Sequence, residues 1–360
     1  MMKIQDIIES IQPLDKVAMN AARSYNDNLI KPLGSLGRLE DLAVQLAGIT
    51  GRVQNDMGKK AILVFCADNG VYAEGVSTAP QEVTAVQATN MLYGKTGVSV
   101  LAKQGNIDLK VVDVGIHTRK KLHPQMIEEK IALQTGNILH EPAMTKQQLE
   151  AAIEVGFRMV KSMKEEGYSI LGTGEMGISN TTTATSVIIA LTGISPKEAA
   201  GKGAGLTREL LLHKIDILEK IQEKHYHASI SPLEVVRRMG GFDIAAMMGA
   251  FMGGAYYHIP IVIDGVVSIA AALACFCCNP LIKDYMLPSH RSAEPAYTIA
   301  AQTMKINPYF ELDMRLGEGS GCPFAMYLAE SAAKIMAEMA TFEEGNVDKK
   351  NYIDIREEEK

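Results

Sequence analysis

Two glutamates in glycine-rich stretches are the side chains of this sequence best suited to catalysis. Glu318 is the one carboxylate of residues 315–323, which also contain three glycines, and Glu175 lies among three further glycines in residues 172–183. Glycine allows sharp turns and lets a substrate approach the backbone, so a carboxylate between glycines is held in a defined place. Two such carboxylates suit acid–base catalysis or stabilisation of a cationic sugar centre. The alternative for either residue is a solvated glutamate in a glycine-rich turn.

The stretch 172–183 also has the composition of an anion-binding loop. It follows an expected strand at 168–171 and precedes an expected helix at 184–191, so free amides and the positive end of a helix dipole should face one place. Ser179, Asn180 and the threonines after them can cap the helix and donate to phosphate oxygens. The stretch matches neither a P-loop nor a dinucleotide fingerprint, so it favours a phosphomonoester. A threonine-rich helix cap without a ligand is the alternative.

Further candidates lie in two other segments. Glycines at 201–205 precede an expected helix that carries Lys214, and the two glycine-rich loops together would surround one sugar phosphate with a lysine as point charge. Taken alone, Lys214 is more often a solvated helix residue. The segment His290-Arg291-Ser292 contains groups that can orient a carboxylate, but a solvated loop is the favoured interpretation.

The elements that must position these residues follow an α/β pattern. Apolar runs of strand length at 61–65, 109–114, 168–171, 259–264 and 285–287 alternate with amphipathic stretches such as 81–92 and 150–164. This alternation predicts a mostly parallel sheet with helices on both faces and a ligand site beyond the carboxyl ends of the strands. Residues 3–50 are predicted to be mainly helical. The alternating Leu312, Met314 and Leu316 predict a short strand that leads into the Glu318 loop.

Composition excludes several classes of function. The chain has 360 residues, of which 47% are hydrophobic and 22% charged, with a net charge of −6. It can bury a large core, and it has no basic patch for nucleic acid or an anionic membrane. The N-terminus lacks the apolar core of a signal peptide, and the longest clean apolar piece, residues 266–278, is too short to span a bilayer. We therefore expect a cytoplasmic protein without nucleic acid or membrane partners, and a frayed charged tail after residue 348.

Two apolar segments leave alternatives open. Cys275, Cys277 and Cys278 include a C-x-x-C spacing, but without a second pair or a histidine nearby they are more typical of small buried side chains than of a metal or redox site. No metal and no cofactor is indicated. The glycine-containing stretch 242–256 suits either the core or a subunit interface, and the core is favoured.

Long blocks of the chain resemble one family, the nicotinate-nucleotide–dimethylbenzimidazole phosphoribosyltransferases. The blocks, in chain order, are Lys31-Pro32-Leu33-Gly34-Ser35-Leu36-Gly37-Arg38-Leu39-Glu40, Ala67-Asp68-Asn69-Gly70-Val71, Gln81-Glu82-Val83-Thr84, Gly174-Glu175-Met176-Gly177-Ile178, Asn180-Thr181-Thr182, Gly241-Phe242-Asp243-Ile244-Ala245, Ile263-Asp264-Gly265, Ser289-His290-Arg291-Ser292 and Arg315-Leu316-Gly317-Glu318-Gly319. The resemblance implies a Rossmann-like sheet in a homodimer. It also implies a small helical domain from both chain ends, residues 1–55 with 325–360, beside a large α/β domain, residues 56–324, that carries the active site.

The resemblance further implies an activity in assembly of the cobalamin nucleotide loop. Ribose 5-phosphate would pass from nicotinate mononucleotide to 5,6-dimethylbenzimidazole or a related base, giving α-ribazole 5'-phosphate and nicotinate. Glu318 matches the family's general base, and Glu175 matches a glutamate close to the reacting centre. The positions similar to the family's phosphate- and nucleotide-binding residues are Gly177, Ile178, Ser179, Asn180, Thr181, Gly203, Gly205 and Lys214. Those expected at the base are Ser77, Thr78, Ala79, Gln87 and Leu316.

One position departs from the family, and two other functions remain as alternatives. Several relatives have serine directly before the proline of the pocket loop, where this chain has Ala79. Either Ser77 and Thr78 compensate for the missing hydroxyl or the preferred base differs, and the sequence leaves the choice open. A nucleoside phosphorylase-like enzyme would use similar phosphate loops and a carboxylate base. A non-catalytic nucleotide-binding protein would not need both Glu175 and Glu318, and the presence of both argues against it.

Overall fold

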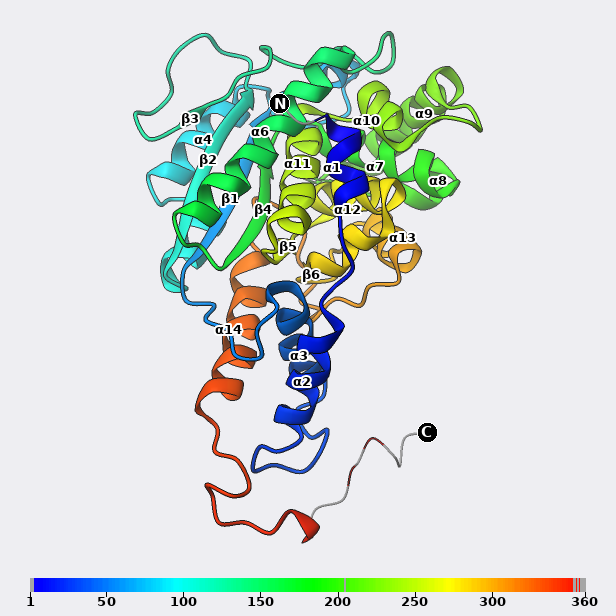
Figure 1. The fold of residues 1–360 in the computed structure, drawn as a ribbon. Helices are drawn as coiled ribbons and strands as arrows, with labels where there is room; N and C mark the ends of the chain where they lie inside the picture. Colours follow the sequence, from blue (N-terminus) through cyan, green and yellow to red (C-terminus); the bar gives the residue numbers. More distant parts are fainter. Residues whose placement is uncertain (1–2, 204, 352–353, 355, 357–360) are drawn as a thin grey trace.

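The computed structural model describes residues 3–203, 205–351, 354 and 356. In this part of the chain six strands form one parallel sheet in the order β3-β2-β1-β4-β5-β6 (Figure 1). The strands are β1 (Lys60–Ala67), β2 (Ile107–Gly115), β3 (Ile127–Glu128), β4 (Ile170–Met176), β5 (Ile261–Ile263) and β6 (Met286–Pro288). The strand order reverses between β1 and β4, as in doubly wound nucleotide-binding sheets. The predicted Rossmann-like α/β class is confirmed.

Both faces of the central strand β1 are buried. Leu63 and Phe65 belong to one hydrophobic cluster, whereas Ile62 and Val64 belong to the other. Successive side chains of a strand point to opposite faces, so an unbroken apolar run contributes to both clusters. This explains why the run 61–65 is apolar at every position.

Helices cover each face of the sheet. The cluster that contains Leu63 is covered by α1 (Ile4–Ser10), α6 (Lys146–Glu165), α7 (Asn180–Thr192), α8 (Pro196–Ala199), α9 (Arg208–His225), α10 (Pro232–Met239), α11 (Phe242–Tyr257), α12 (Val266–Cys278) and α13 (Pro295–Met304). The opposite cluster is covered by α2 (Lys16–Asn26), α3 (Arg38–Thr50), α4 (Val83–Leu92), α5 (Gly97–Gln104) and α14 (Cys322–Glu338). Short 3₁₀ turns occur at η1 (Gly70–Glu74), η2 (Pro280–Tyr285) and η3 (Lys349–Asn351).

Helix α11 is a core helix, because it packs backbone to backbone against α6. A Cβ at Gly249 would lie 1.9 Å from the carbonyl oxygen of Ile153, and one at Gly156 would lie 1.8 Å from that of Ala246. Only glycine allows such an approach. Of the two interpretations of residues 242–256, core packing is therefore correct, and α11 leaves no exposed face for a second subunit.

The two chain ends meet at one end of the molecule. Helices α2, α3 and α14 lie side by side below the sheet in Figure 1. An antiparallel bridge between Leu29 and Thr341 joins the segments that precede α3 and follow α14. Helix α1, however, packs on α11 in the larger part of the molecule. The division into residues 1–55 with 325–360 and residues 56–324 stays a prediction.

Some predicted elements differ from the structure. Residues 3–50 form three helices rather than one continuous helical stretch, since Asp15 caps α2 and residues 27–37 intervene before α3. The strand predicted at Leu312–Leu316 is wrong: the segment is irregular, Asp313 has a φ of 51°, and Leu312 and Leu316 are exposed. Among the described residues no neighbouring strand pairs with this segment, and alternation alone does not make a strand.

Two expectations concern the surface and the tail. Among the described residues, no helix combines the length and the apolar character needed to cross a bilayer. Most of the tail predicted to fray, including residues 352–353, 355 and 357–360, lies outside the described residues.

Candidate active site

The candidate site lies at the carboxyl ends of β1, β4 and β5. Strand β4 continues to Met176 and α7 already begins at Asn180. Glu175 therefore lies on the end of a strand, not in the loop where it was predicted, and Asn180 and Thr181 belong to the first turn of the helix. The correction follows from pairing, because Phe65 and Cys66 of β1 extend the ladder to Glu175 and Met176.

Glu175 and Glu318 lie next to each other. The backbone amide of Glu318 donates to Glu175 Oε1 at 3.3 Å. On its other side, the Asn180 side-chain amide donates to Glu175 Oε2 and to Asp243 Oδ2, the latter at 3.0 Å. Burial raises the pKa of Glu175 to about 8 and that of Asp243 to about 6. The structure thus brings the two predicted glutamates together above a group of buried acids.

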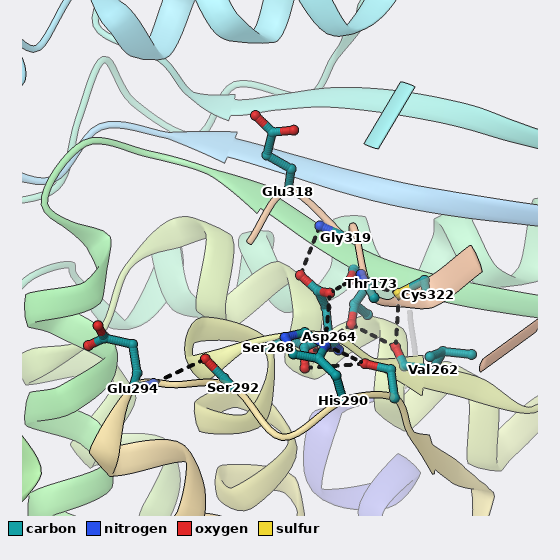
Figure 2. A network of polar contacts seen from close by, with 12 residues as sticks. Thr173, Val262, Asp264, Ser268, His290, Ser292, Glu294, Glu318, Gly319 and Cys322 are labelled. Atoms are coloured by element: carbon teal, nitrogen blue, oxygen red, sulfur yellow. Dashed lines mark hydrogen bonds and ion pairs between the residues drawn. The ribbon is translucent and has the colours of Figure 1, made fainter. Parts of the chain in front are cut away.

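Glu318 is only 5% exposed, and its carboxylate points away from the buried Asp264 (Figure 2). Its Oε2 accepts a hydrogen bond from the amide of Val98 at 3.2 Å, in the first turn of α5. Burial raises the pKa of Glu318, and hydrogen bonds from Val98, Thr96 and Gly97 oppose the rise. A carboxylate with a raised pKa is a stronger base, and the helix terminus supports its charge.

The predicted phosphate loop and the second glycine cluster meet. They line a small cavity of about 60 Å³ whose walls include Gly177, Ile178, Ser179, Asn180, Thr181, Lys202 and Gly203. A Cβ at Gly203 would lie 2.9 Å from Thr181 Oγ1, so the two loops touch there. Gly205 is close in sequence but is not among the residues that line the cavity.

Lys214 is buried, which corrects the solvated position favoured when the residue is taken alone. Its Nζ donates to Thr181 Oγ1 at 3.1 Å and to the carbonyl oxygen of Gly201 at 3.4 Å. Burial lowers the pKa of Lys214 to about 8, while Glu294 raises it. The Lys214 ammonium group thus forms hydrogen bonds with both glycine-rich segments.

Not every predicted phosphate ligand is available. The amide of Ile178 donates to Thr84 Oγ1 at 3.0 Å, and the side chain of Asn180 is engaged by two carboxylates. Ser179 has a φ of 76°, is buried, and its Oγ has no hydrogen-bond partner among the described residues. A buried hydroxyl without a partner at a helix N-terminus is a suitable donor to a phosphate oxygen.

The predicted base-binding residues are divided between two places. Ser77 and Thr78 line the cavity beside the phosphate loop. Ala79 donates its amide to Ser77 Oγ at 3.3 Å, and Gln87 Oε1 accepts from Asn90 on the same helix. Leu316 lies near Glu318 instead, since a Cβ at Gly97 would be 2.5 Å from Leu316 Cδ2 and 3.6 Å from Glu318 Oε2.

Sequence reasoning from single motifs missed several buried polar residues here. Asp243 and Asp264 are 0% and 1% exposed, and burial raises the pKa of Asp264 to about 7. Asp264 directly follows the apolar run of β5, which is where a parallel sheet presents its ligands, and this signal could have found it. The solvated loop favoured for residues 290–292 is correct only for Arg291, which is exposed, because His290 is 1% exposed and Ser292 is buried.

Comparison with known proteins shows the family to which the chain belongs. A family model described as Phosphoribosyltransferase matches residues 11–347. The chain belongs to this phosphoribosyltransferase family. Among its relatives, the nicotinate-nucleotide–dimethylbenzimidazole phosphoribosyltransferase of Clostridium perfringens is 44% identical over 356 residues, covering 99% of this chain and 98% of the relative. The enzyme of the same name from Escherichia coli is 40% identical over 348 residues, covering 96% and 97%.

A solved structure of the phosphoribosyltransferase family supports the fold. The crystal structure of CobT from Thermus thermophilus matches with a TM-score of 0.88 at 35% sequence identity, covering 92% of this chain and 99% of that chain. The resemblance found in the sequence blocks is confirmed, as is the class of enzyme. The roles of individual site residues stay predictions.

Proposed function

We propose that this phosphoribosyltransferase moves ribose 5-phosphate from nicotinate mononucleotide to 5,6-dimethylbenzimidazole or a related base. The products are α-ribazole 5'-phosphate and nicotinate, used in assembly of the cobalamin nucleotide loop. The relatives' names support the reaction class. The observation that carries the proposal is the buried Glu318 carboxylate, held at the start of α5 beside Glu175.

The chemistry requires one base and no acid. Nicotinate leaves from a positively charged pyridinium nitrogen, so its departure needs no proton. The attacking azole has a second ring nitrogen whose proton becomes acidic as the new bond forms. Glu318, with its raised pKa, takes that proton.

The stereochemistry fits a single displacement. A β-nucleotide gives an α-product when the azole attacks from the face opposite nicotinate, so inversion needs no covalent intermediate. Glu175 would stabilise the positive charge on the ribose. Its pKa of about 8 leaves it largely protonated before substrate binds, and a bound pyridinium cation favours its ionised form.

The cavity between the two glycine-rich loops would hold the phosphate. Ser179 and Thr181 supply hydroxyl groups there, and Lys214 supplies positive charge through Thr181. A fixed phosphate orients the ribose towards the two glutamates. Leu316, which contacts Gly97 next to Glu318, would pack on the azole.

The proposal includes a homodimer in the cytosol. All five cysteines are free thiols, which fits a reducing compartment. Light scattering coupled to size-exclusion chromatography tests the dimer, since a monomer at working concentration would contradict it.

Chromatographic product analysis tests the reaction. The purified protein is incubated with nicotinate mononucleotide and, separately, with 5,6-dimethylbenzimidazole, adenine and phenol. We expect a new ribotide with one equivalent of nicotinate, and the acceptor that gives the most ribotide is the preferred base. Release of nicotinate that depends on inorganic phosphate would instead indicate a phosphorylase, and tight nucleotide binding without product would indicate a binding protein.

A further inference from the structure

The backbone around Glu318 adopts a conformation that needs outside support. Gly317, Glu318 and Gly319 have φ values of 79°, 64° and 94° in succession. Glycine adopts positive φ freely, but a residue with a Cβ does so at a cost of about 1 kcal/mol. A non-glycine residue persists there only when its surroundings hold it, and such residues gather at functional sites.

Asp264 supplies that support from beneath the loop. Its Oδ2 accepts the amide of Gly319 at 2.9 Å and its Oδ1 accepts the amide of Gly321 at 2.7 Å (Figure 2). One carboxylate therefore clamps the backbone directly after Glu318. Two hydrogen bonds that one buried side chain accepts from consecutive turns of the loop are well suited to oppose the strain.

Asp264 is itself fixed by buried neighbours. It follows β5, it is 1% exposed, and its amide donates to Ser268 Oγ at 3.1 Å. Ser268 Oγ in turn lies 2.7 Å from Thr173 Oγ1 on β4. The clamp is thus attached to two central strands rather than to a mobile surface.

Asp264 is not placed to react with a substrate. Both of its oxygens face backbone amides, whereas the Glu318 carboxylate extends in the other direction, towards Val98 (Figure 2). Its action on the reaction must therefore pass through the loop.

We propose that Asp264 is a positioning residue: it binds the backbone that follows Glu318, holds residues 317–319 in their left-handed conformation and thereby aims the Glu318 carboxylate at the azole. The inference rests on the proposed function, since it assigns Glu318 as the base. It predicts a defect in turnover without a defect in binding of nicotinate mononucleotide.

The variant Asp264→Asn tests the clamp, because an amide has the shape of the carboxylate but can accept only one of the two hydrogen bonds. We expect kcat to fall about 10-fold or more, since small misplacements of a catalytic group have effects of this size. The dissociation constant of nicotinate mononucleotide, measured by calorimetry, should stay within about 3-fold of the wild-type value.

Asp113→Asn is a matched control for the loss of such a carboxylate. Asp113 is 4% exposed at the end of β2 and accepts the amides of Gly115 and Ile116 at 3.0 and 2.9 Å. Both amides bind its Oδ1, and its Oδ2 pairs with Lys130 at 2.7 Å, so the variant replaces a buried, amide-binding carboxylate in a different loop. Its kcat should remain within about 3-fold of wild type. An equal loss of kcat in both variants would show a general effect on folding and would overturn the proposal.

A double-mutant cycle with Glu318→Gln separates positioning from a structural role. If Asp264 acts through Glu318, adding Asp264→Asn to Glu318→Gln should lower kcat by less than about 3-fold further. The inference would be overturned if the double variant lost kcat by the product of the two single losses. An unchanged kcat in Asp264→Asn, or weaker nucleotide binding by that variant, would also overturn it. Should Asp264→Asn fail to fold, Ser268→Ala can replace it in the double-mutant cycle, and a smaller loss of kcat is then expected in the single variant.

Amide hydrogen exchange tests the Asp264 clamp without relying on enzyme activity, so its outcome is independent of the proposed function. The amides of Gly319 and Gly321 should exchange about 10-fold or more faster in Asp264→Asn than in the wild type. If the wild type formed no ribotide, the proposed function would fail while this measurement still decided whether Asp264 holds the loop. Unchanged exchange would overturn the clamp itself.

Discussion

The position of Glu318, the proposed base, depends on contacts that come from distant parts of the chain. Its carboxylate meets α5, its amide meets Glu175, and the residues that follow it meet Asp264. Each contact limits one degree of freedom of the side chain or backbone. The carboxylate therefore has a defined position before substrate binds, which suits the proton transfer proposed for it.

Glu318→Gln should lower kcat by about 10²-fold or more, because glutamine cannot accept the azole proton. Affinity for nicotinate mononucleotide should remain within about 3-fold of wild type, since the nucleotide reaches the site before the azole reacts. Steady-state kinetics and calorimetry measure the two quantities. The control is Glu311→Gln, an exposed glutamate in the same segment. Wild-type turnover in Glu318→Gln would exclude this residue as the base.

Affinity for nicotinate mononucleotide should weaken as the pH rises through about 8. The pKa of Lys214 is lowered to about 8 by burial, so the lysine is charged below that pH and neutral above it, and only the charged form attracts phosphate. Lys214→Met should bind about 10-fold more weakly at pH 7 and lose this dependence. Calorimetric titrations from pH 6.5 to 9 measure it, with the exposed Lys220→Met as control. The same pH dependence in both variants would rule out Lys214.

At the scale of single residues, the sequence indicates which side chains belong to the candidate site better than it indicates how deeply they are buried. Glu175 and Glu318 are indicated by their glycine neighbours. The burial of Lys214 is not, because its helix has a solvated pattern and its partner Thr181 lies 33 residues away in the chain. A contact between distant segments leaves no mark on local periodicity.

At the scale of helices and strands, local sequence patterns predict some strands correctly, whereas pairing with a neighbouring strand determines others. The apolar run of β1 predicts a buried parallel strand, and it is one. The end of β4 is decided by β1, which pairs with Glu175 and Met176 although glycines at 172 and 174 suggest a loop. The segment 312–316 shows the reverse, since it has strand-like alternation but no pairing partner in the described part of the chain.

The contact between α6 and α11 should not tolerate a methyl group. In Gly249→Ala the new Cβ would lie 1.9 Å from the Ile153 carbonyl oxygen, so the two helices must separate. We expect the free energy of unfolding to fall by about 3 kcal/mol, measured by urea denaturation. Ser162→Ala, which adds alanine on the exposed face of α6, should change it by less than about 0.5 kcal/mol. Similar values for the two variants would contradict close packing at this contact.

In the whole molecule the strand order explains why the site forms where it does. The order reverses between β1 and β4, so the loops that follow them diverge and leave room at the carboxyl ends. A sequence of alternating elements predicts a parallel sheet but not its strand order, because each connection can cross in either direction along the sheet. The resemblance to a known family implied a Rossmann-like sheet, and the strand order itself comes from the structure.

Arg38 joins the helical end of the molecule to the segment that leads to Glu318. From the start of α3 it donates to the carbonyl oxygens of Asn307 and Pro308 and lies over the Tyr309 ring at 4.9 Å. Arg38→Met should lower the free energy of unfolding by about 1 kcal/mol and reduce kcat several-fold. Thermal unfolding and kinetics measure these effects. As a control, Arg158→Met removes a surface ion pair and should leave kcat unchanged. An unchanged kcat in Arg38→Met would show that the contacts of Arg38 do not affect the segment that leads to Glu318.

The five thiols differ in accessibility, and that difference offers a handle for chemical labelling. Cys277 is exposed, whereas Cys66, Cys275 and Cys322 are buried. It lies at the far end of α12, a helix of 13 residues that begins just after Asp264 and Gly265, so about 20 Å of helix separates it from the candidate site. A fluorophore coupled there, with Cys278 replaced by serine, would let single molecules be followed through substrate binding and unfolding while the site stays free of dye.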